Sequence, residues 1–182
     1  NTAFDLGNVG PDFRYGWGRI DANRSLATLE DNRYFLDSIG QAGQNTHSIS
    51  IPANVKEVRV MVYWSEPPAA PGAGKALIND LDMQLSTPGG AVNLPLILDP
   101  TPNPVNLNLP AVPGVDTLNN VEQVRIQDPV AGTYTLTVSG TSVPEGPQRY
   151  YVLYEFLTED ITLTYPIGGE GFVPGTFELL RW

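Results

Sequence analysis

The chain has 182 residues, of which 20 are acidic and 10 are basic, and its formal net charge is −10. This balance excludes nucleic acid as an expected partner, because binding phosphates requires a basic surface. The absence of cysteine excludes disulfides, zinc–thiolate sites and cysteine nucleophiles. With 18 glycines, 17 prolines and only 16% charged residues, the composition favours strands and turns over helices.

The first segment, Asn1 to Leu26, has too few apolar residues to form a core of its own. Its large apolar side chains, Phe4, Phe13 and Trp17, are therefore expected to pack against another domain. Asp21 to Asn32 is the one predicted helix: Asp21 is a suitable N-cap, and apolar residues share one face.

From about Gln44 onward the apolar residues alternate with polar ones, a period typical of strands that bury one face. Clusters of Gly, Pro and Asp separate these runs and predict turns. Arg149 to Leu157 is apolar or aromatic on both faces, which predicts a central strand. We therefore expect a mainly β chain, a two-sheet antiparallel β-sandwich with one short N-terminal helix. The inward-facing residues are predicted to be Ile49, Ile51, Val58, Val60, Val62, Trp64, Leu81, Met83, Leu85, Tyr134, Leu136 and Val138.

Two stretches depart from this strand pattern. Leu94 to Val115 contains six prolines, so it is expected to be an extended crossover at a sheet edge or over one face, not a central strand. The stretch from Ile161 to Trp182 looks like the opening strands of an immunoglobulin-like or fibronectin-like module, cut before it could form a sandwich.

Two sequence resemblances give these elements a context. The run Tyr15-Gly16-Trp17-Gly18-Arg19-Ile20-Asp21-Ala22 resembles the end of a subtilisin-like serine peptidase domain, where a Gly-Trp-Gly-Arg turn leads into a closing helix. A second series is similar to the β-jelly-roll that follows the catalytic domain in one group of subtilases, akin to the P domain of proprotein convertases. That series consists of Val60 to Ser65, Leu77 to Met83, Asn119 to Glu122, Gly132 to Thr135 and Val143 to Gln148. The proline-rich crossover departs from that family, which usually has a shorter, polar, Asp-containing loop there.

The resemblances imply a division into three parts. Residues 1–33 would be the tail of a subtilase catalytic domain, and residues 34–159 a jelly-roll of the P-domain or galactose-binding-like kind. Residues 160–182 would be the start of a truncated module. The implied function is a non-catalytic accessory domain that stabilises the catalytic domain of a secreted, bacterial serine endopeptidase and biases substrate access. Its implied partners are the upstream catalytic domain and the protein or peptide substrates of the parent, and its implied location is extracellular.

Catalysis by this chain itself is not expected. A Ser–His–Asp triad needs a histidine base, and the only histidine, His47, lies at a predicted strand start. No complete Gly-Thr-Ser-Met nucleophile turn occurs in the sequence, since Gly140-Thr141-Ser142 is followed by Val143 and Pro144. His47 is thus expected to be a polar residue at a strand edge.

An alternative function is an independent module that binds glycan or a cell surface through an aromatic platform, and a third is a structural spacer. The platform residues would be Tyr63, Trp64, Tyr150, Tyr151 and Tyr154. Exposed, coplanar tyrosines would favour the platform, whereas buried ones would remove it, since aromatic alternation in a strand more often marks a core.

Calcium is the one cofactor that the sequence suggests. Asp80 and Asp82 lie two residues apart on one predicted strand, so both carboxylates project from one face, where they repel unless a cation lies between them. Calcium takes six to eight oxygen ligands, including carboxylates and amides. The alternative is a solvated face paired with Lys75 or Arg125. The candidate calcium ligands are Asn79, Asp80, Asp82, Asn119, Asn120 and Glu122.

Overall fold

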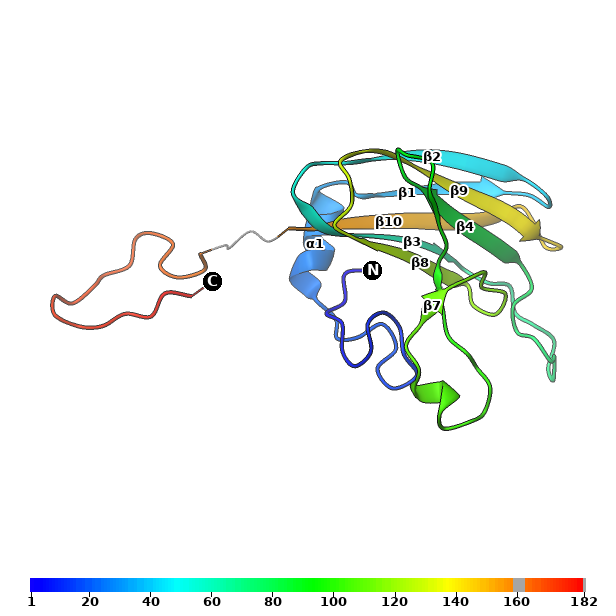
Figure 1. Cartoon of the computed structure of the whole chain (residues 1–182), viewed down its shortest axis with the longest axis horizontal. Helices are drawn as coiled ribbons and strands as arrows, with labels where there is room; N and C mark the ends of the chain where they lie inside the picture. The colour runs from blue at the N-terminus through cyan, green and yellow to red at the C-terminus, as the bar shows by residue number, and fades with distance from the viewer. Residues whose placement is uncertain (159–162, 182) are drawn as a thin grey trace.

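The structure is a computed structural model that describes residues 1–158 and 163–181. The described part of the chain contains one α-helix and ten strands (Figure 1). The strands pair with one another in antiparallel fashion. In chain order they are α1 (Ala22–Glu30), β1 (Tyr34–Ile39), β2 (Gln44–Ile51), β3 (Val55–Trp64), β4 (Asp80–Ser86), β5 (Val92–Asn93), β6 (Leu96–Ile97), the 3₁₀ turn η1 (Asn106–Asn108), β7 (Val112–Pro113), β8 (Val121–Gln127), β9 (Gly132–Ser142) and β10 (Gln148–Thr158).

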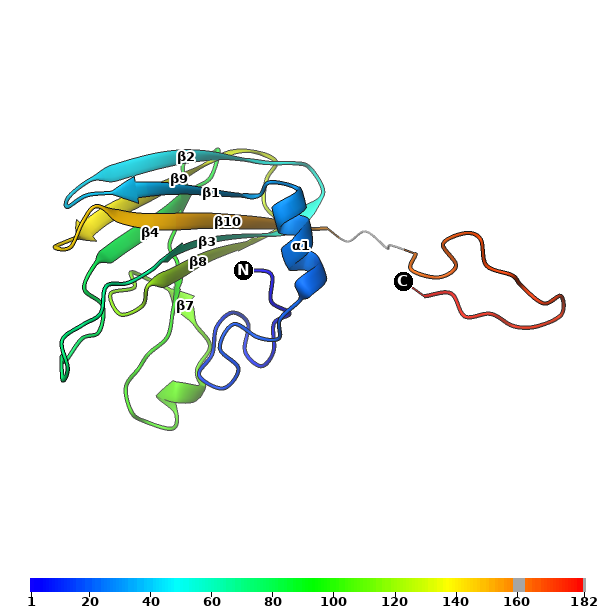
Figure 2. The same cartoon turned by 180° about the vertical axis from the view of Figure 1, so that it is seen from behind.

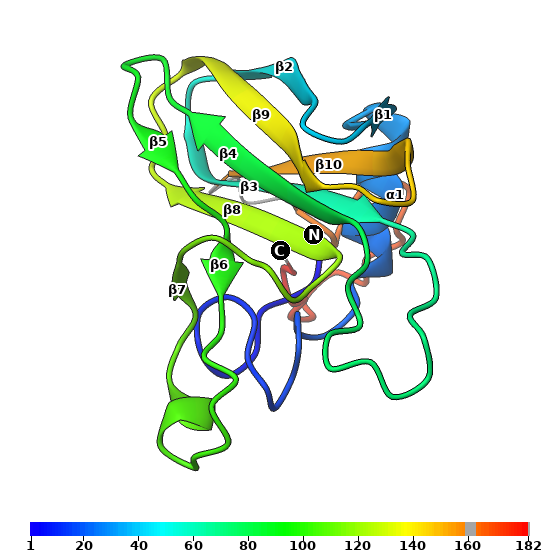
Figure 3. The same ribbon diagram turned by 90° about the vertical axis from the view of Figure 1, so that its right-hand side faces the viewer.

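The main strands form two four-stranded antiparallel sheets in the orders β1-β10-β3-β8 and β2-β9-β4-β5. Figure 3 shows the two sheets as separate layers. Apart from the short hairpin β4–β5, successive main strands alternate between the two sheets, which is the connectivity of an eight-stranded jelly-roll. This confirms the predicted β-sandwich. We call the sheet that contains β3 and β10 the front sheet and the other the back sheet.

The core lies between the facing surfaces of the two sheets. Trp64, Tyr134 and Tyr150 are the largest of its fully buried side chains. The alternation in the sequence predicts this core well, because a strand that lies on one layer buries every second side chain. All the predicted inward-facing residues are in the core cluster: Ile49, Ile51, Val58, Val60, Val62, Trp64, Leu81, Met83, Leu85, Tyr134, Leu136 and Val138.

The proline-rich crossover is extended, as expected. It holds the short strands β6 and β7, which pair only with each other, and the single turn η1. This ribbon lies below the two sheets in Figure 3 and places Leu96 and Leu98 against the N-terminal segment.

The N-terminal segment, residues 1–20, lies on the outer surface of the front sheet, and α1 follows it against β10 (Figure 2). Phe4 and Arg19 pair through two backbone hydrogen bonds of 2.8 and 2.9 Å, so the segment folds back on itself. Gly18 allows this close approach, because a Cβ there would collide with the carbonyl oxygen of Phe4, and its φ is +100°. The Asp21 carboxylate then caps α1 by accepting from the Arg24 N–H at 3.0 Å, as the sequence predicts.

Residues 163–181 contain one isolated bridge, between Tyr165 and Arg181, and no longer strand pairing among the described positions. The expected truncated module over residues 160–182 stays a prediction. Its first residues, 160–162, its last, Trp182, and the last residue expected for the sandwich, Glu159, lie outside the described residues. In the two described ranges, no helix combines the length and apolarity needed to cross a bilayer.

Candidate functional site

The outer surface of the front sheet carries charged residues that are buried. Charged residues on the outer surface of a sheet are usually exposed to solvent. Glu57, Arg59 and Arg125 are almost fully enclosed, with side chains at most 10% exposed. Glu57 Oε1 accepts from Arg59 Nε at 2.7 Å and from Arg125 Nε at 2.6 Å. The N-terminal segment completes the network: Asp5 Oδ2 accepts from Arg125 Nη1 at 2.6 Å, and the Ala3 carbonyl accepts from Arg59 Nη1 at 2.9 Å. The segment is therefore bound to the sheet through charge-assisted hydrogen bonds.

The pKa values of Glu57 and Arg125 reflect this pairing. Burial alone would raise the pKa of Glu57, but hydrogen bonds from Arg59 and Arg125 outweigh it and lower this pKa to about 2. Burial alone would lower the pKa of Arg125, whereas its bonds to Glu57 and Asp5 raise it. Glu57 and Arg125 are therefore ionised at neutral pH.

A second ion pair fastens α1. Arg24 Nε and Nη2 donate to the two oxygens of Glu155 on β10 at 2.6 and 2.7 Å, a bidentate arrangement. Thr28, one turn further on, is buried and bonds back to the Arg24 carbonyl. Both the segment and its helix are thus held by arginine–carboxylate pairs.

The first 29 residues also carry large apolar side chains that are exposed to solvent. Ile20 is 86% exposed and Val9 is 70% exposed, although both are aliphatic. Exposed apolar side chains that form a contiguous patch mark a surface for a protein partner. The set comprises Phe4, Val9, Phe13, Tyr15, Ile20, Leu26 and Leu29, all within the first 29 residues. We call it the apolar N-terminal face.

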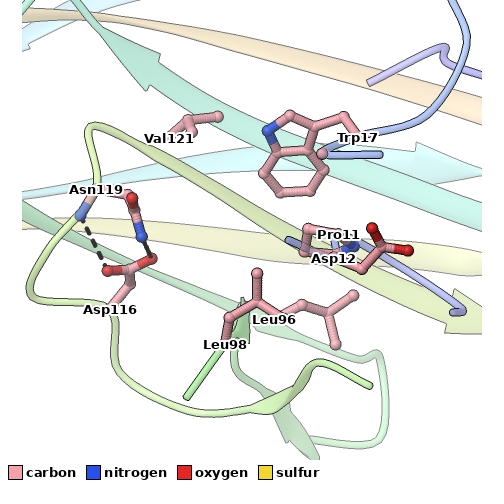
Figure 4. Close-up of a pocket in the computed structure, with 9 residues that line it drawn as sticks. Pro11, Asp12, Trp17, Leu96, Leu98, Asp116, Asn119 and Val121 are labelled. Atoms are coloured by element: carbon pink, nitrogen blue, oxygen red, sulfur yellow. Dashed lines mark hydrogen bonds between the residues drawn. The ribbon is translucent and has the colours of Figure 1, made fainter. Parts of the chain in front are cut away.

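A small cavity of about 140 Å³ lies between the segment, the β6 ribbon and the loop before β8 (Figure 4). Figure 4 shows the Trp17 ring on one side of it and Leu96 and Leu98 on the opposite side. Asp116, with Asn119, lies at one end of the cavity and Asp12 at the other. Trp17 thus has partners in the sandwich, while Phe4 and Phe13 stay about half exposed.

The three predicted acidic calcium ligands lie near one another, but each carboxylate binds a different partner. Asp80 binds Lys75 at 3.1 Å, and Asp82 accepts from the Thr141 hydroxyl. Glu122, only 2% exposed, accepts from the Met83 N–H at 2.7 Å. One oxygen each of Asp80 and Glu122 is buried without a hydrogen-bond partner in the described part of the structure.

The pKa values show how strongly these acids interact. Burial, opposed in part by the Met83 N–H bond and reinforced by the charges of Asp82, Asp116 and Asp80, raises the pKa of Glu122 to about 9. Burial also raises the pKa of Asp80 despite its bond to Lys75. Glu122 is therefore a neutral carboxylic acid at pH 7.

The three predicted amide ligands serve other contacts. Asn79 is fully buried and bonds Gln148 and the backbone of Glu145. The side chain of Asn120 donates to the Trp64 carbonyl at 2.7 Å, and that of Asn119 donates to Asp116 at 2.7 Å. Over residues 1–158 and 163–181, no three acidic, histidine or cysteine side chains gather in a geometry that could hold a metal. The calcium site stays a prediction.

His47 lies on β2, an edge strand of the back sheet, and its side chain is half-buried. Its Nε2 lies 2.7 Å from the hydroxyl of Tyr150, and its ring lies 4.6 Å from that of Phe35. Burial lowers the pKa of His47, opposed by the charge of Asp37 3.7 Å away. The interpretation of His47 as a structural polar residue fits these contacts.

The aromatic residues expected to form a platform are divided between the two faces of the front sheet. Trp64 and Tyr150 are fully buried in the core, and Tyr154 is partly buried against it. Tyr63 and Tyr151 lie side by side on the outer face, 41% and 38% exposed, with ring centroids 6.4 Å apart and planes 28° apart. The platform is thus reduced to one tyrosine pair.

Sequence reasoning missed the residues that attach the N-terminal segment. Asp5, Arg59 and Arg125 are far apart in the chain, and only pairing of β3 with β8 brings the two arginines side by side. A usable signal was the position of Glu57 and Arg59 on the polar side of a strand whose other side is apolar. Asp116, a neighbour of the predicted Asn119, was also missed.

No protein-family model matches the chain. Two proteins of Dictyostelium discoideum, both named serine protease/ABC transporter B family proteins, are similar to it in sequence. TagB is 34% identical over 97 residues, which is 51% of this chain and 5% of that protein. TagA is 26% identical over 153 residues, which is 78% of this chain and 8% of that protein. The chain therefore spans less than a tenth of the length of these relatives.

Two solved structures are distantly similar. The lipase BlEst2 of Bacillus licheniformis in its propeptide form has a TM-score of 0.42 and 14% identity, covering 70% of this chain and 22% of that one. The serine protease of Aeromonas sobria has a TM-score of 0.29 and 16% identity, covering 82% of this chain and 32% of that one. Both scores are low, so the sequence similarity to part of two proteins named as serine proteases is the informative link.

Proposed function

We propose that this chain is an accessory β-sandwich of a subtilisin-like serine endopeptidase, which stabilises the catalytic domain by holding that domain's final segment. The proposal extends to an extracellular location and to protein or peptide substrates of the parent. Support comes from the similarity to proteins named as serine proteases and from the resemblance of residues 15–22 to the closing turn of a subtilase.

The observation that carries the proposal is the two-sided N-terminal segment. Asp5 and Ala3 bind the buried Arg59 and Arg125 of the sheet, so one side of the segment belongs to the sandwich. The residues of the apolar N-terminal face are exposed to solvent and are of the kind that packs into a second core. A segment with this character can join two domains rigidly.

The chain itself supplies no peptide hydrolysis in this proposal. His47 is engaged with Tyr150. The Gly140-Thr141-Ser142 run lies at the end of strand β9, with strand β10 and not a helix after it, and with Val143 in place of methionine. The isolated chain should therefore neither hydrolyse casein nor react with a serine-directed fluorophosphonate probe. Labelling at a serine of this chain would contradict the non-catalytic role.

The stabilising role is tested in the natural polypeptide that contains this chain. Asp5→Asn removes the charge that ties the segment to Arg125, and Asp31→Asn is a matched control at an exposed position. The half-life of peptidase activity on a chromogenic peptide is measured at raised temperature. We expect Asp5→Asn to shorten this half-life severalfold while initial kcat/KM stays within about twofold, since breaking a buried pair costs up to about 3 kcal/mol. Equal half-lives for the two variants would refute the proposal that the segment held through Asp5 stabilises the catalytic domain.

A second candidate function is glycan binding at the Tyr63–Tyr151 pair, favoured by its exposure and near-parallel rings. The test is retention of the chain on insoluble chitin, cellulose and peptidoglycan. Tyr151→Ala should abolish retention, and Tyr34→Ala, exposed on neighbouring β1, is the control. Absence of retention by the wild-type chain would remove this candidate.

A further inference from the structure

We propose that the cavity beside Trp17 is a binding site for a single basic side chain, arginine in preference to lysine, presented by a peptide. The proposal rests on the size, lining and charge of the cavity and does not depend on the proposed function.

The size limits the ligand to one side chain. The cavity holds about 140 Å³, whereas sites for drug-sized molecules are about 300 to 1,000 Å³. Its walls are the Trp17 ring on one side and Leu96 and Leu98 on the other (Figure 4). A flat or linear group would be held between these walls, as the alkyl stem of an arginine or lysine is when it lies on apolar surface.

The ends of the cavity are acidic. Asp12 and Asp116 are 6% and 5% exposed. The Asp116 carboxylate accepts from the backbone N–H groups of residues 118 and 119 at 2.8 and 3.0 Å and from the Asn119 amide at 2.7 Å. The Asp12 carboxylate likewise accepts three backbone N–H groups, from residues 8, 14 and 15. A carboxylate has about four acceptor sites, so each retains one.

The negative charge of these two acids is not matched by an ion pair. Among the ion pairs of the described residues, none includes Asp12 or Asp116. Burial raises the pKa of Asp12, but bonds from the backbone of Tyr15, Arg14 and Asn8, with the charge of Arg14, outweigh it and lower this pKa. Arg14 therefore partly offsets the charge of Asp12.

These features select the ligand chemistry. A guanidinium group can bond the remaining acceptor site of Asp116, and its stem and plane can stack on Trp17, which is the best aromatic partner for a cation. An acidic side chain would be repelled by both ends and by the net charge of −10. Asp116 is the expected anchor, because Asp12 already has Arg14 nearby.

The test titrates the ¹⁵N-labelled chain with four acetylated, amidated tripeptides, Gly-X-Gly, where X is arginine, lysine, norleucine or glutamate. Binding is followed by chemical-shift changes at the Trp17 indole N–H and at the backbone amides of the cavity. We expect arginine to bind more tightly than lysine, and lysine more tightly than norleucine, with no binding of glutamate. Raising the salt concentration should weaken arginine binding toward that of norleucine.

Asp116→Asn provides the mutational test, since asparagine keeps an oxygen for the two backbone N–H groups but loses the charge and the oxygen that accepts from the Asn119 amide. It should weaken arginine binding about fivefold and leave norleucine unchanged, whereas Asp12→Asn should have a smaller effect. Asp128→Asn, exposed at the other end of β8, is the control. Equal affinity for arginine and norleucine in the wild-type chain would overturn the proposal. So would unchanged arginine binding in a folded Asp116→Asn variant, or shifts confined to residues outside the cavity.

Discussion

Glu122 offers the sharpest test of the electrostatics of this sandwich. It lies on β8, at the edge of the front sheet, and its carboxyl group accepts from the Met83 N–H of β4 in the back sheet. The β5 strand pairs only with Leu85 and Ser86, so Glu122 takes the place of a missing strand at Met83. Replacing Glu122 with glutamine keeps an acceptor oxygen for this N–H and removes the acidic proton.

The sign of the effect follows from the raised pKa. The pKa of Glu122 rises from 4.5 to about 9 on folding, so its contribution to stability is complete below pH 4.5 and is lost as the pH rises through about 9. Between pH 4.5 and 7 the loss is about 3 kcal/mol, at about 1.36 kcal/mol per pH unit. Glutamine does not titrate, so the Glu122→Gln variant does not lose stability over this pH range. We therefore expect the variant to be more stable than wild type at pH 7, by up to about 3 kcal/mol, and nearly equal to it at pH 4.

The assay is thermal and urea unfolding of the chain between pH 4 and pH 9, with excess chelator present. A gain of about 3 kcal/mol corresponds to a midpoint higher by roughly 6 to 12 °C for a domain of this size. Glu30→Gln, exposed on α1, is the control and should show no such pH-dependent gain. If Glu122→Gln were less stable than wild type at pH 7 and equal to it at pH 4, Glu122 would be a charged group with a favourable partner, and the reasoning would be refuted.

Three further predictions concern other parts of the structure. Because the pKa of Glu57 is lowered to about 2, its contribution to the stability of the fold is complete above pH 4.5 and is lost as the pH falls through about 2. Glu57→Gln should therefore reduce the loss of stability at acidic pH in urea unfolding. An unchanged loss would exclude the pairing of Glu57 with Arg125. Leu81→Ala should cost about 2 to 5 kcal/mol in urea unfolding, because Leu81 is fully buried between the sheets, and a cost below 1 kcal/mol would mean that the core relaxes around it. If calcium binds near Asp80 and Asp82, millimolar calcium should raise the melting midpoint by roughly 5 °C over chelator, and Asp80→Asn or Asp82→Asn should abolish the rise; identical midpoints in the wild-type chain would remove the site.

The strands and the core could be predicted from the sequence because both are local properties. The alternation of Tyr134, Leu136 and Val138 with threonines needs only the geometry of a single strand to predict which side chains are buried. The N-cap of α1 at Asp21 and the extended crossover follow equally from short-range chemistry.

The candidate sites depended on long-range pairing, and here the sequence alone was insufficient. Asp80 and Asp82 share a face, as their spacing requires, yet whether Glu122 would be charged beside them depended on its burial between the sheets.

The attachment of the N-terminal segment was likewise decided by tertiary structure. Arg59 and Arg125 become neighbours only through the register of β3 with β8, and Asp5 reaches them only because the segment folds back over that sheet. Local periodicity thus determined the two layers of this protein, whereas strand order and burial decided which of its charges meet, because the energy of a charge depends on the distance to its neighbours and on how much water surrounds it.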